Sequence, residues 1–302
     1  MELTGRQIES FAQSMPEGAR LGFRGGLVLR GPRAFGALSA LVTRGDQFLA
    51  ATDTGHFVDG AMVLDDGWLK GLAAVRLTPR MGLSGMPVRS KSEGDAEALT
   101  LADGSAWVLV ESSRNVLAYP IDGLRVDADA TPRAVPVPPA VRQLGRKGIE
   151  AMATLPGGEM LFTAEGRDGT DTVTAAYRTG AGRFAVARRE GYAITGADAL
   201  PGGDVVIVER RWRGGLDVAM RVRRLGRDAI AAGAIADGPV LLEAGIAAEI
   251  DNMEAIAAEI VDGKIALTLV SDDNHNFFQR TLMLRFIVTD PLPRPNPRRP
   301  ET

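Results

Sequence analysis

The sequence predicts an all-β fold, a single β-propeller of five blades, and three observations lead to this prediction. Glycine accounts for 36 of the 302 residues, which indicates many tight turns. The apolar segments between the turns are short, as in Ala106 to Val110 and Asp204 to Val208, which favours strands over long helices. A unit of strand, Pro/Gly/Asp turn, strand and acidic residue recurs along the chain in five copies.

The copies follow one another at the spacing of propeller blades. They begin at Leu38, Ala96, Ile149, Thr195 and Met253. Aligning them makes five positions equivalent: Ser39, Glu97, Glu150, Thr195 and Glu254. These positions lie about 45 to 60 residues apart, near the length that a four-stranded blade needs. Alternating sequence follows the acidic ends, as in Val218 to Leu225, so each copy supplies about four strands.

The last copy ends after its third strand, Arg280 to Val288. We expect the segment from Leu21 to Leu29, which precedes the first copy, to supply the missing strand and close the ring, because closure removes an open sheet edge. Residues 1–20 are then an N-terminal extension, 21–290 the propeller and 291–302 a Pro/Arg-rich tail. Six blades are the alternative count, and a β-sandwich or two β-domains are the alternative folds.

The composition excludes several kinds of site. Without cysteine there is no thiol nucleophile, disulfide or iron–sulfur centre, and two histidines cannot form a three-histidine metal site. With 35 basic and 38 acidic residues, the net charge of −3 argues against nucleic acid as a partner. No apolar run approaches the roughly 20 residues that cross a bilayer, and no export signal is visible.

Common catalytic motifs do not match either. There is no G-x-S-x-G, since the string from Gly82 to Met86 fails at its last position, and no phosphate-binding loop or dinucleotide fingerprint. His56 is expected at the channel rim. Trp212 is expected in the core, with the wall of a pocket as its alternative place.

Three of the equivalent positions are acidic, and their convergence points to a cation. The first strand of each blade lines the channel of a propeller, so Glu97, Glu150 and Glu254 should meet at one mouth, where like charges raise one another's pKa or require a cation. Every available ligand is oxygen, which favours Ca²⁺. The predicted ligands are Glu97, Glu254, Asp53, Asp272 and Asn274, with Asn252 nearby.

Two alternatives to the metal stay open. The acids could instead form ion pairs with nearby cations, namely Arg146, Lys147, Arg210 and Arg280, or they could point outward. Asp272, Asn274 and Asn276 repeat oxygen side chains at every second position, as a calcium loop does. Phe277 stands where that loop needs glycine, so the alternative is an Asx-turn between two strands.

Several strings together resemble the phytase-like family, described as "esterase-like activity of phytase", a family of bacterial propellers. They include GDAEAL, RKGIEAMATLPGG, ITGADALPGGDVVIVERRW and SDDNHNFFQRTLMLRF, and the resemblance runs from about Phe35 to Phe286. It implies hydrolysis of phosphate or carboxylic esters and a periplasmic or secreted location, with the cytoplasm as the alternative. It places the family's acidic positions at Glu97, Glu111, Glu150, Glu165, Glu209 and Glu254, with Asp53, Asp272, Asp273 and Asn274.

The predicted chemistry is metal-assisted hydrolysis of a small anionic substrate by a monomer. A metal-bound water would be the nucleophile and Glu150 the general base, while Lys147, Arg210 and Arg280 would hold anionic oxygens. Phosphomonoesters suit this arrangement best, and a lactone or carboxylic ester also suits it. The competing function is a non-catalytic propeller that binds a ligand or protein. Such a propeller should pair its acids with arginines and carry an apolar or aromatic patch on its rim.

Overall fold

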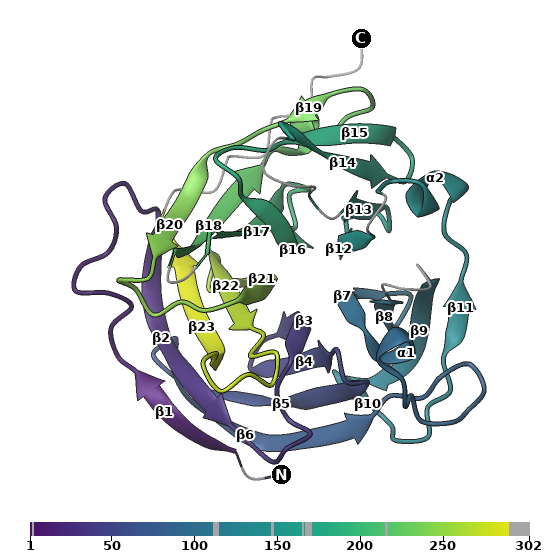
Figure 1. Ribbon diagram of the computed structural model, residues 1–302, viewed down its shortest axis with the longest axis horizontal. Coiled ribbons are helices and arrows are strands. Elements are labelled where there is room, and N and C mark those ends of the chain that lie inside the picture. The colour runs from purple at the N-terminus through teal and green to yellow at the C-terminus, as the bar shows by residue number, and fades with distance from the viewer. Residues whose placement is uncertain are drawn as a thin grey trace.

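The computed structural model is a ring of five β-sheets around a central axis (Figure 1). It describes residues 1, 3–110, 115–145, 148–164, 166, 171–214 and 217–289. The predicted all-β fold with five blades is confirmed, and the six-blade ring, the sandwich and the two-domain alternatives are wrong. No helix within these residues is long and apolar enough to cross a membrane.

The blades follow one another along the chain. Blade 1 contains β3 (Leu38–Arg44), β4 (Gln47–Thr52), β5 (His56–Asp65) and β6 (Trp68–Pro79). Blade 2, preceded by α1 (Lys91–Gly94), contains β7 (Ala96–Ala102), β8 (Ser105–Val110), β9 (Asn115–Asp122), β10 (Arg125–Val126) and β11 (Arg133–Val135). Blade 3, preceded by α2 (Pro139–Arg142), contains β12 (Ile149–Thr154), β13 (Met160–Ala164), β14 (Val173–Arg178), β15 (Gly182–Ala187) and β19 (Ile235–Ala236).

Blade 4 contains β16 (Ala193–Ala199), β17 (Val205–Trp212), β18 (Val218–Leu225) and β20 (Val240–Gly245), with the short 3₁₀ helix η1 (Arg227–Ala229) after β18. Blade 5 joins the two ends of the chain. It contains β21 (Met253–Val261), β22 (Lys264–Ser271) and β23 (Thr281–Val288), followed by β2 (Leu21–Arg30) and β1 (Thr4–Ile8).

The ring closes through β2, as the sequence predicts. This strand pairs antiparallel with β23, from Leu21 opposite Val288 to Leu29 opposite Thr281. β1 then pairs with the outer edge of β2, with Thr4 opposite Arg30. Residues 1–20 therefore supply the outermost strand of blade 5.

Burial on both faces explains why the second strand of each blade is a continuous apolar run. Seven of the eight residues of β22 are buried, and β13 is buried throughout, because each blade packs between two neighbours. Tight Asp-Gly turns join several strand pairs. Asp103 and Gly104 both have positive φ, which is the geometry of a two-residue hairpin loop.

Candidate functional site

Each of the five innermost strands begins with a β-bulge. In every case the register shifts at one residue, and the five shifted residues are Ser39, Glu97, Glu150, Thr195 and Glu254. These are the positions that the repeat makes equivalent. A bulge adds a residue to one strand and re-aims its side chain, so one backbone device sets all five side chains at the same end of the channel.

Small residues follow the bulges and bring the innermost strands close together. They are Ala40, Ala98, Ala151, Gly196 and Ala255, and all line the channel together with Ser39, Glu97 and Glu254. The cavity between them has a volume of about 10 Å³, room for about one water. The closest approach is at Gly196, where an added Cβ would lie 2.8 Å from the carbonyl oxygen of Glu254. A substrate therefore has to bind at the mouth of the channel.

Glu254 is one of these bulge residues, and its surroundings perturb its carboxyl strongly. Its side chain is 15% exposed, and burial raises the pKa of its carboxyl to about 7. The carboxyls of Asp272 and Asp53 raise this pKa further, whereas Arg210 and a hydrogen bond with Asn252 lower it. Arg210 comes from the end of β17, and its Nη1 lies 3.1 Å from Oε1 of Glu254. The predicted metal ligand Glu254 is thus the partner of a guanidinium.

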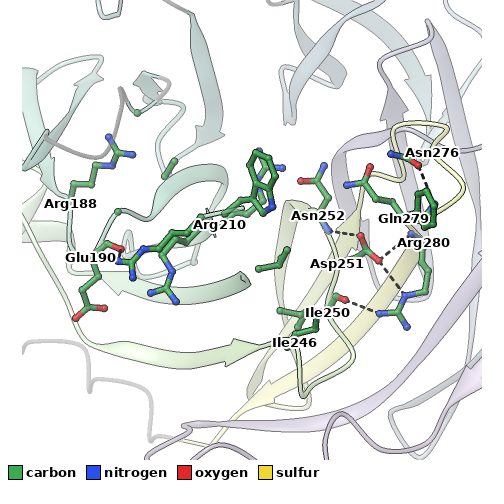
Figure 2. A pocket seen from close by; sticks show the side chains of 18 of the residues that line it. Arg188, Glu190, Arg210, Ile246, Ile250, Asp251, Asn252, Asn276, Gln279 and Arg280 are labelled. Carbon is green, nitrogen blue, oxygen red and sulfur yellow. Dashed lines mark hydrogen bonds and ion pairs between the residues drawn. The ribbon is translucent and has the colours of Figure 1, made fainter. Parts of the chain in front are cut away.

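Arg280 holds the opposite wall of the mouth. Its Nη1 lies 2.6 Å from Oε2 of Glu249, its Nε lies 3.2 Å from Oδ2 of Asp251, and its Nη2 donates to the carbonyl of Ile250. Figure 2 shows the contacts of Arg280 with Asp251 and Ile250, and the neighbouring Asn252, whose amide donates to Asp251. Arg280 therefore fixes the connection between β20 and β21 in place.

A pocket of about 1170 Å³ opens between these two walls. Arg188, Glu190 and Arg210 lie on one side of it, and Asp251, Asn252, Gln279 and Arg280 lie on the other (Figure 2). Five arginines line the pocket: Arg188, Arg210, Arg211, Arg213 and Arg280. Three acids do so, Asp171, Glu190 and Asp251. The described lining thus has an excess of positive charge, although the whole chain is acidic.

The pocket also has an apolar rim. Trp212 is 68% exposed, Phe278 is 88% exposed and Ile246 is 58% exposed, and all three line it. The interpretation of Trp212 as a core residue is wrong, and its alternative place at the pocket is confirmed. Large apolar side chains exposed together around a cavity mark a binding site.

The loop between β22 and β23 forms part of this rim, and its polar side chains cap its own backbone. Oδ1 of Asp272 accepts a hydrogen bond of 2.6 Å from the amide of Asn274, and Oδ1 of Asn276 accepts one from Phe278. Asp273 accepts bonds from the amides of Ala37 and His275. The Asx-turn interpretation of this segment is confirmed. Asn274 itself is exposed and bonds to Gln279, away from Glu254.

On blade 1, Asp53 lies near a buried cation. Arg80 is fully buried, and its Nη2 donates to the carbonyls of Gly94 and Glu93. Burial lowers the pKa of Arg80, whereas Tyr119, Asp53 and Asp95 raise it. Burial also lowers the pKa of His56 nearby. The acids Glu254, Asp272 and Asp53 thus interact electrostatically, with Arg210 beside Glu254 and Arg80 near Asp53.

The predicted site residues therefore divide into groups. Arg210 and Arg280 line the pocket, and Glu254 contacts Arg210. Glu97 lines the narrow channel, and Glu150 occupies the equivalent bulge of blade 3. Lys147 lies outside the described residues, as do Arg146, Glu111 and Glu165. Glu209 lies off the channel, where its carboxylate binds Arg221 and Arg223.

Three of the predicted calcium ligands lie close enough to interact electrostatically, since Asp272 and Asp53 raise the pKa of Glu254. Among the side chains that the structure describes, no group of three or more acidic or histidine residues is arranged to hold a metal ion. In this structure Glu254 faces a guanidinium and Asp272 caps a turn, so two of the predicted ligands have partners within the chain.

Sequence reasoning did not single out Arg188, Asp251 and Phe278, which line the pocket. They lie in the connections between strands or blades, where the repeat gives no alignment. The signal that could have found Phe278 is the pair of adjacent phenylalanines in a polar loop, because such a loop does not bury aromatic rings.

Comparison with known proteins gives a family and several distant structures. The family profile described as "Phytase-like: Esterase-like activity of phytase" matches residues 33–275. No curated protein matches. Solved structures that resemble the chain include the PQQ-bound aldose sugar dehydrogenase of Streptomyces coelicolor, with 11% identity, a TM-score of 0.46 and coverage of 94% of this chain and 98% of that one. Another is the α-L-arabinofuranosidase of Lactobacillus brevis, with 10% identity, a TM-score of 0.49 and coverage of 87% and 97%.

Proposed function

The chain belongs to the phytase-like family, and on that basis we propose that it hydrolyses esters carrying an anionic group in the pocket between blades 4 and 5. Glu254 acts as the general acid–base, and Arg210 and Arg280 hold anionic oxygens of the substrate. The observation that carries this proposal is the contact of 3.1 Å between Arg210, which lines the pocket, and Glu254, whose pKa is raised to about 7.

A carboxyl with this pKa suits proton transfer at neutral pH. Glu254 takes a proton from a water molecule, and the water oxygen forms a bond to the phosphorus or carbonyl carbon of the ester. The ester bond to the alcohol oxygen breaks, and the alcohol leaves with the proton that Glu254 held. Arginine suits the anionic oxygens because its planar group donates two hydrogen bonds to one phosphate or carboxylate.

Phosphate esters and carboxylic esters both satisfy this arrangement. The excess of arginine in the pocket supports a substrate with negative charge, and the phosphomonoester carries the most. Lactones and carboxylic esters that bear an anionic group are also candidate substrates. The location stays a prediction: the periplasm or outside the cell, with the cytoplasm as the alternative. The monomeric state also stays a prediction.

Replacing Glu254 tests the proposal directly. Glu254→Gln keeps the size of the side chain and removes its charge, so hydrolysis of 4-nitrophenyl phosphate or of a 4-nitrophenyl ester of a dicarboxylic acid should fall about 10²- to 10⁴-fold. Glu97→Gln is the matched control, because Glu97 occupies the equivalent bulge of blade 2, whereas Glu254 contacts Arg210, which lines the pocket. Glu150→Gln tests the base predicted from the sequence.

Activity in Glu254→Gln equal to that of the wild type would contradict the proposal. Loss of hydrolytic activity in Glu150→Gln, with activity kept in Glu254→Gln, would make Glu150 the general base. Circular dichroism and thermal unfolding of each variant show whether it is folded.

The sequence predicts calcium binding, whereas the ion pair of Glu254 with Arg210 argues against it, and thermal unfolding decides between the two. A cation that binds only the folded chain must raise its melting temperature. Because Arg210 already neutralises Glu254, we expect the melting temperature in EGTA to stay the same on titration with calcium. A saturable rise of several degrees would contradict this expectation and make calcium a ligand of the acids at the channel mouth.

A second candidate function is a propeller that binds an anionic ligand without chemistry. It is favoured by the pairing of Glu254, Glu249 and Asp251 with arginines and by the aromatic rim, the two features expected of a binding module. Binding of ester and product with equal affinity, and no turnover with either ester class, would support this function.

A further inference from the structure

The aromatic rim lies beside the cationic groups of the pocket. Trp212 lies two residues after Arg210 on β17, and side chains two apart on a strand share a face. Phe278 lies two residues before Arg280, on the opposite wall. Each wall of the pocket thus presents an aromatic ring close to an arginine.

The ring of Phe278 is exposed, and the loop that carries it is held in place. The amide of Phe278 donates to Oδ1 of Asn276, and its ring packs edge-to-face on Phe277 with the centroids 5.7 Å apart. The loop is anchored at both ends. Asp273 accepts a bond from the amide of Ala37, and Arg280 binds Asp251. A loop held in this way loses little conformational entropy when a ligand covers the ring of Phe278.

We propose that the pocket takes an amphiphilic anion, a small molecule with an anionic group at Arg210 and Arg280 and a flat apolar group between Trp212, Phe278 and Ile246. The proposal rests on the function above and names its substrate class: esters of phenols or other apolar alcohols rather than of polyols. The hollow of about 1170 Å³ favours a small molecule, because a protein partner would need a flatter surface.

The chemistry of the rim supports this class. Aromatic rings bind flat apolar groups by stacking and by burying area, and neither contact is available to a polyol that is polar on all sides. The nearby guanidinium of Arg213, which donates to the carbonyl of Glu190, adds charge to the same side as Trp212. A ligand with charge alone would leave both rings in water.

Calorimetric titration with compounds that cannot be hydrolysed tests the proposal apart from catalysis. Phenylphosphonate should bind at least about tenfold more tightly than methylphosphonate, because only it carries the ring. Trp212→Ala and Phe278→Ala should each remove most of this difference. Phe277→Ala is the matched control, since Phe277 is equally exposed at 95% but does not line the pocket.

Several outcomes would overturn the proposal. One is equal affinity for the two phosphonates, and another is an equal effect of Phe277→Ala and Phe278→Ala on the affinity for phenylphosphonate. A third is inositol hexakisphosphate binding more tightly than phenylphosphonate, with an affinity that neither Trp212→Ala nor Phe278→Ala changes. Sedimentation with phosphatidylserine vesicles that is lost in both phenylalanine variants would assign the rings to a lipid surface instead.

Glu254→Gln separates the two proposals. It should still bind phenylphosphonate while ester cleavage is lost. Binding by the wild type without cleavage of any ester would reject the hydrolase and keep the amphiphilic ligand. Cleavage of alkyl and aryl phosphates at equal kcat/KM would keep the hydrolase and reject the amphiphilic ligand.

Discussion

A carboxyl that titrates near neutral pH affects activity and stability in opposite directions. Burial raises the pKa of Glu254 to about 7, so the carboxylate that accepts a proton accumulates only as the pH rises through this value. We therefore predict that kcat/KM increases with pH up to about 7 and then levels. A pH–rate profile of the wild type measures this increase. The residual activity of Glu254→Gln should lack it, and a wild-type profile that is flat between pH 5 and 8 would contradict the assignment.

The raised pKa of Glu254 also makes the stability of the fold depend on pH. Because the folded-state pKa of Glu254 lies above its ordinary value of 4.5, its contribution to stability is complete below that value and is lost as the pH rises through about 7. The wild type should lose melting temperature relative to Glu254→Gln between pH 5 and pH 8. This difference is independent of any substrate.

Adjacent residues on β17 have separate roles because side chains alternate along a strand. Glu209 is 1% exposed and binds Arg221 and Arg223 at the interface of blades 3 and 4, whereas Arg210 faces the pocket. The sequence pattern marks both as charged residues at the end of a strand. Which of them faces the pocket depends on the phase of the strand, and composition and spacing do not show that phase.

At the scale of elements, the innermost strands of blades 4 and 5 set the position of Glu254. Gly196 lets β16 approach β21, and an added Cβ would lie 2.8 Å from the carbonyl oxygen of Glu254 and 3.0 Å from Cα of Ala255. Gly196→Ala should therefore lower the free energy of unfolding by about 1–3 kcal/mol and reduce activity with it. Denaturant unfolding measures the loss. Gly71→Ala, where the nearest atom is 3.9 Å away, should change little, and equal effects of both would contradict the role of close packing.

The repeat predicts strands well and connections poorly. Strand starts such as Leu38, Ala96 and Ile149 agree with the aligned copies, because turn glycines and apolar runs are local signals. The pocket, however, depends on segments such as 246–252 and 272–280, whose shape comes from side-chain bonds to distant backbone, as in the bond from Ala37 to Asp273. Such contacts join residues far apart in the sequence, so no spacing predicts them.

Charge explains the difference between the predicted and the observed acidic centre. The sequence places Glu97, Glu150 and Glu254 at one mouth, and the bulges confirm their equivalence. The predicted need for neutralisation is met at Glu254 by Arg210, a residue that the ion-pair alternative names. An acid is paired with an arginine only where the arginine of a neighbouring blade is close enough to contact it. The spacing of residues in a single sequence does not give the distance between side chains of different blades.

At the scale of the whole molecule, the first 20 residues stabilise the ring from outside. Phe11 is 1% exposed and packs edge-to-face on Phe286 with the ring centroids 5.2 Å apart, and its carbonyl accepts a bond from the amide of Glu249. We predict that Phe11→Ala lowers the free energy of unfolding by about 3–5 kcal/mol. Deletion of residues 1–20 should lower the melting temperature further and cause association in size-exclusion chromatography, because it uncovers the edge of β2. An unchanged melting temperature in both variants would contradict this role.

The pairing of β2 with β23 also orders events during synthesis on the ribosome. Leu21 leaves the ribosome before blades 1 to 4, but its partner Val288 emerges only after them, so β2 stays without that partner while these blades form. The last blade to fold thereby carries Glu254 and Arg280, and an incomplete chain cannot assemble the pocket. Binding in this pocket therefore requires a chain that has been made at least through β23.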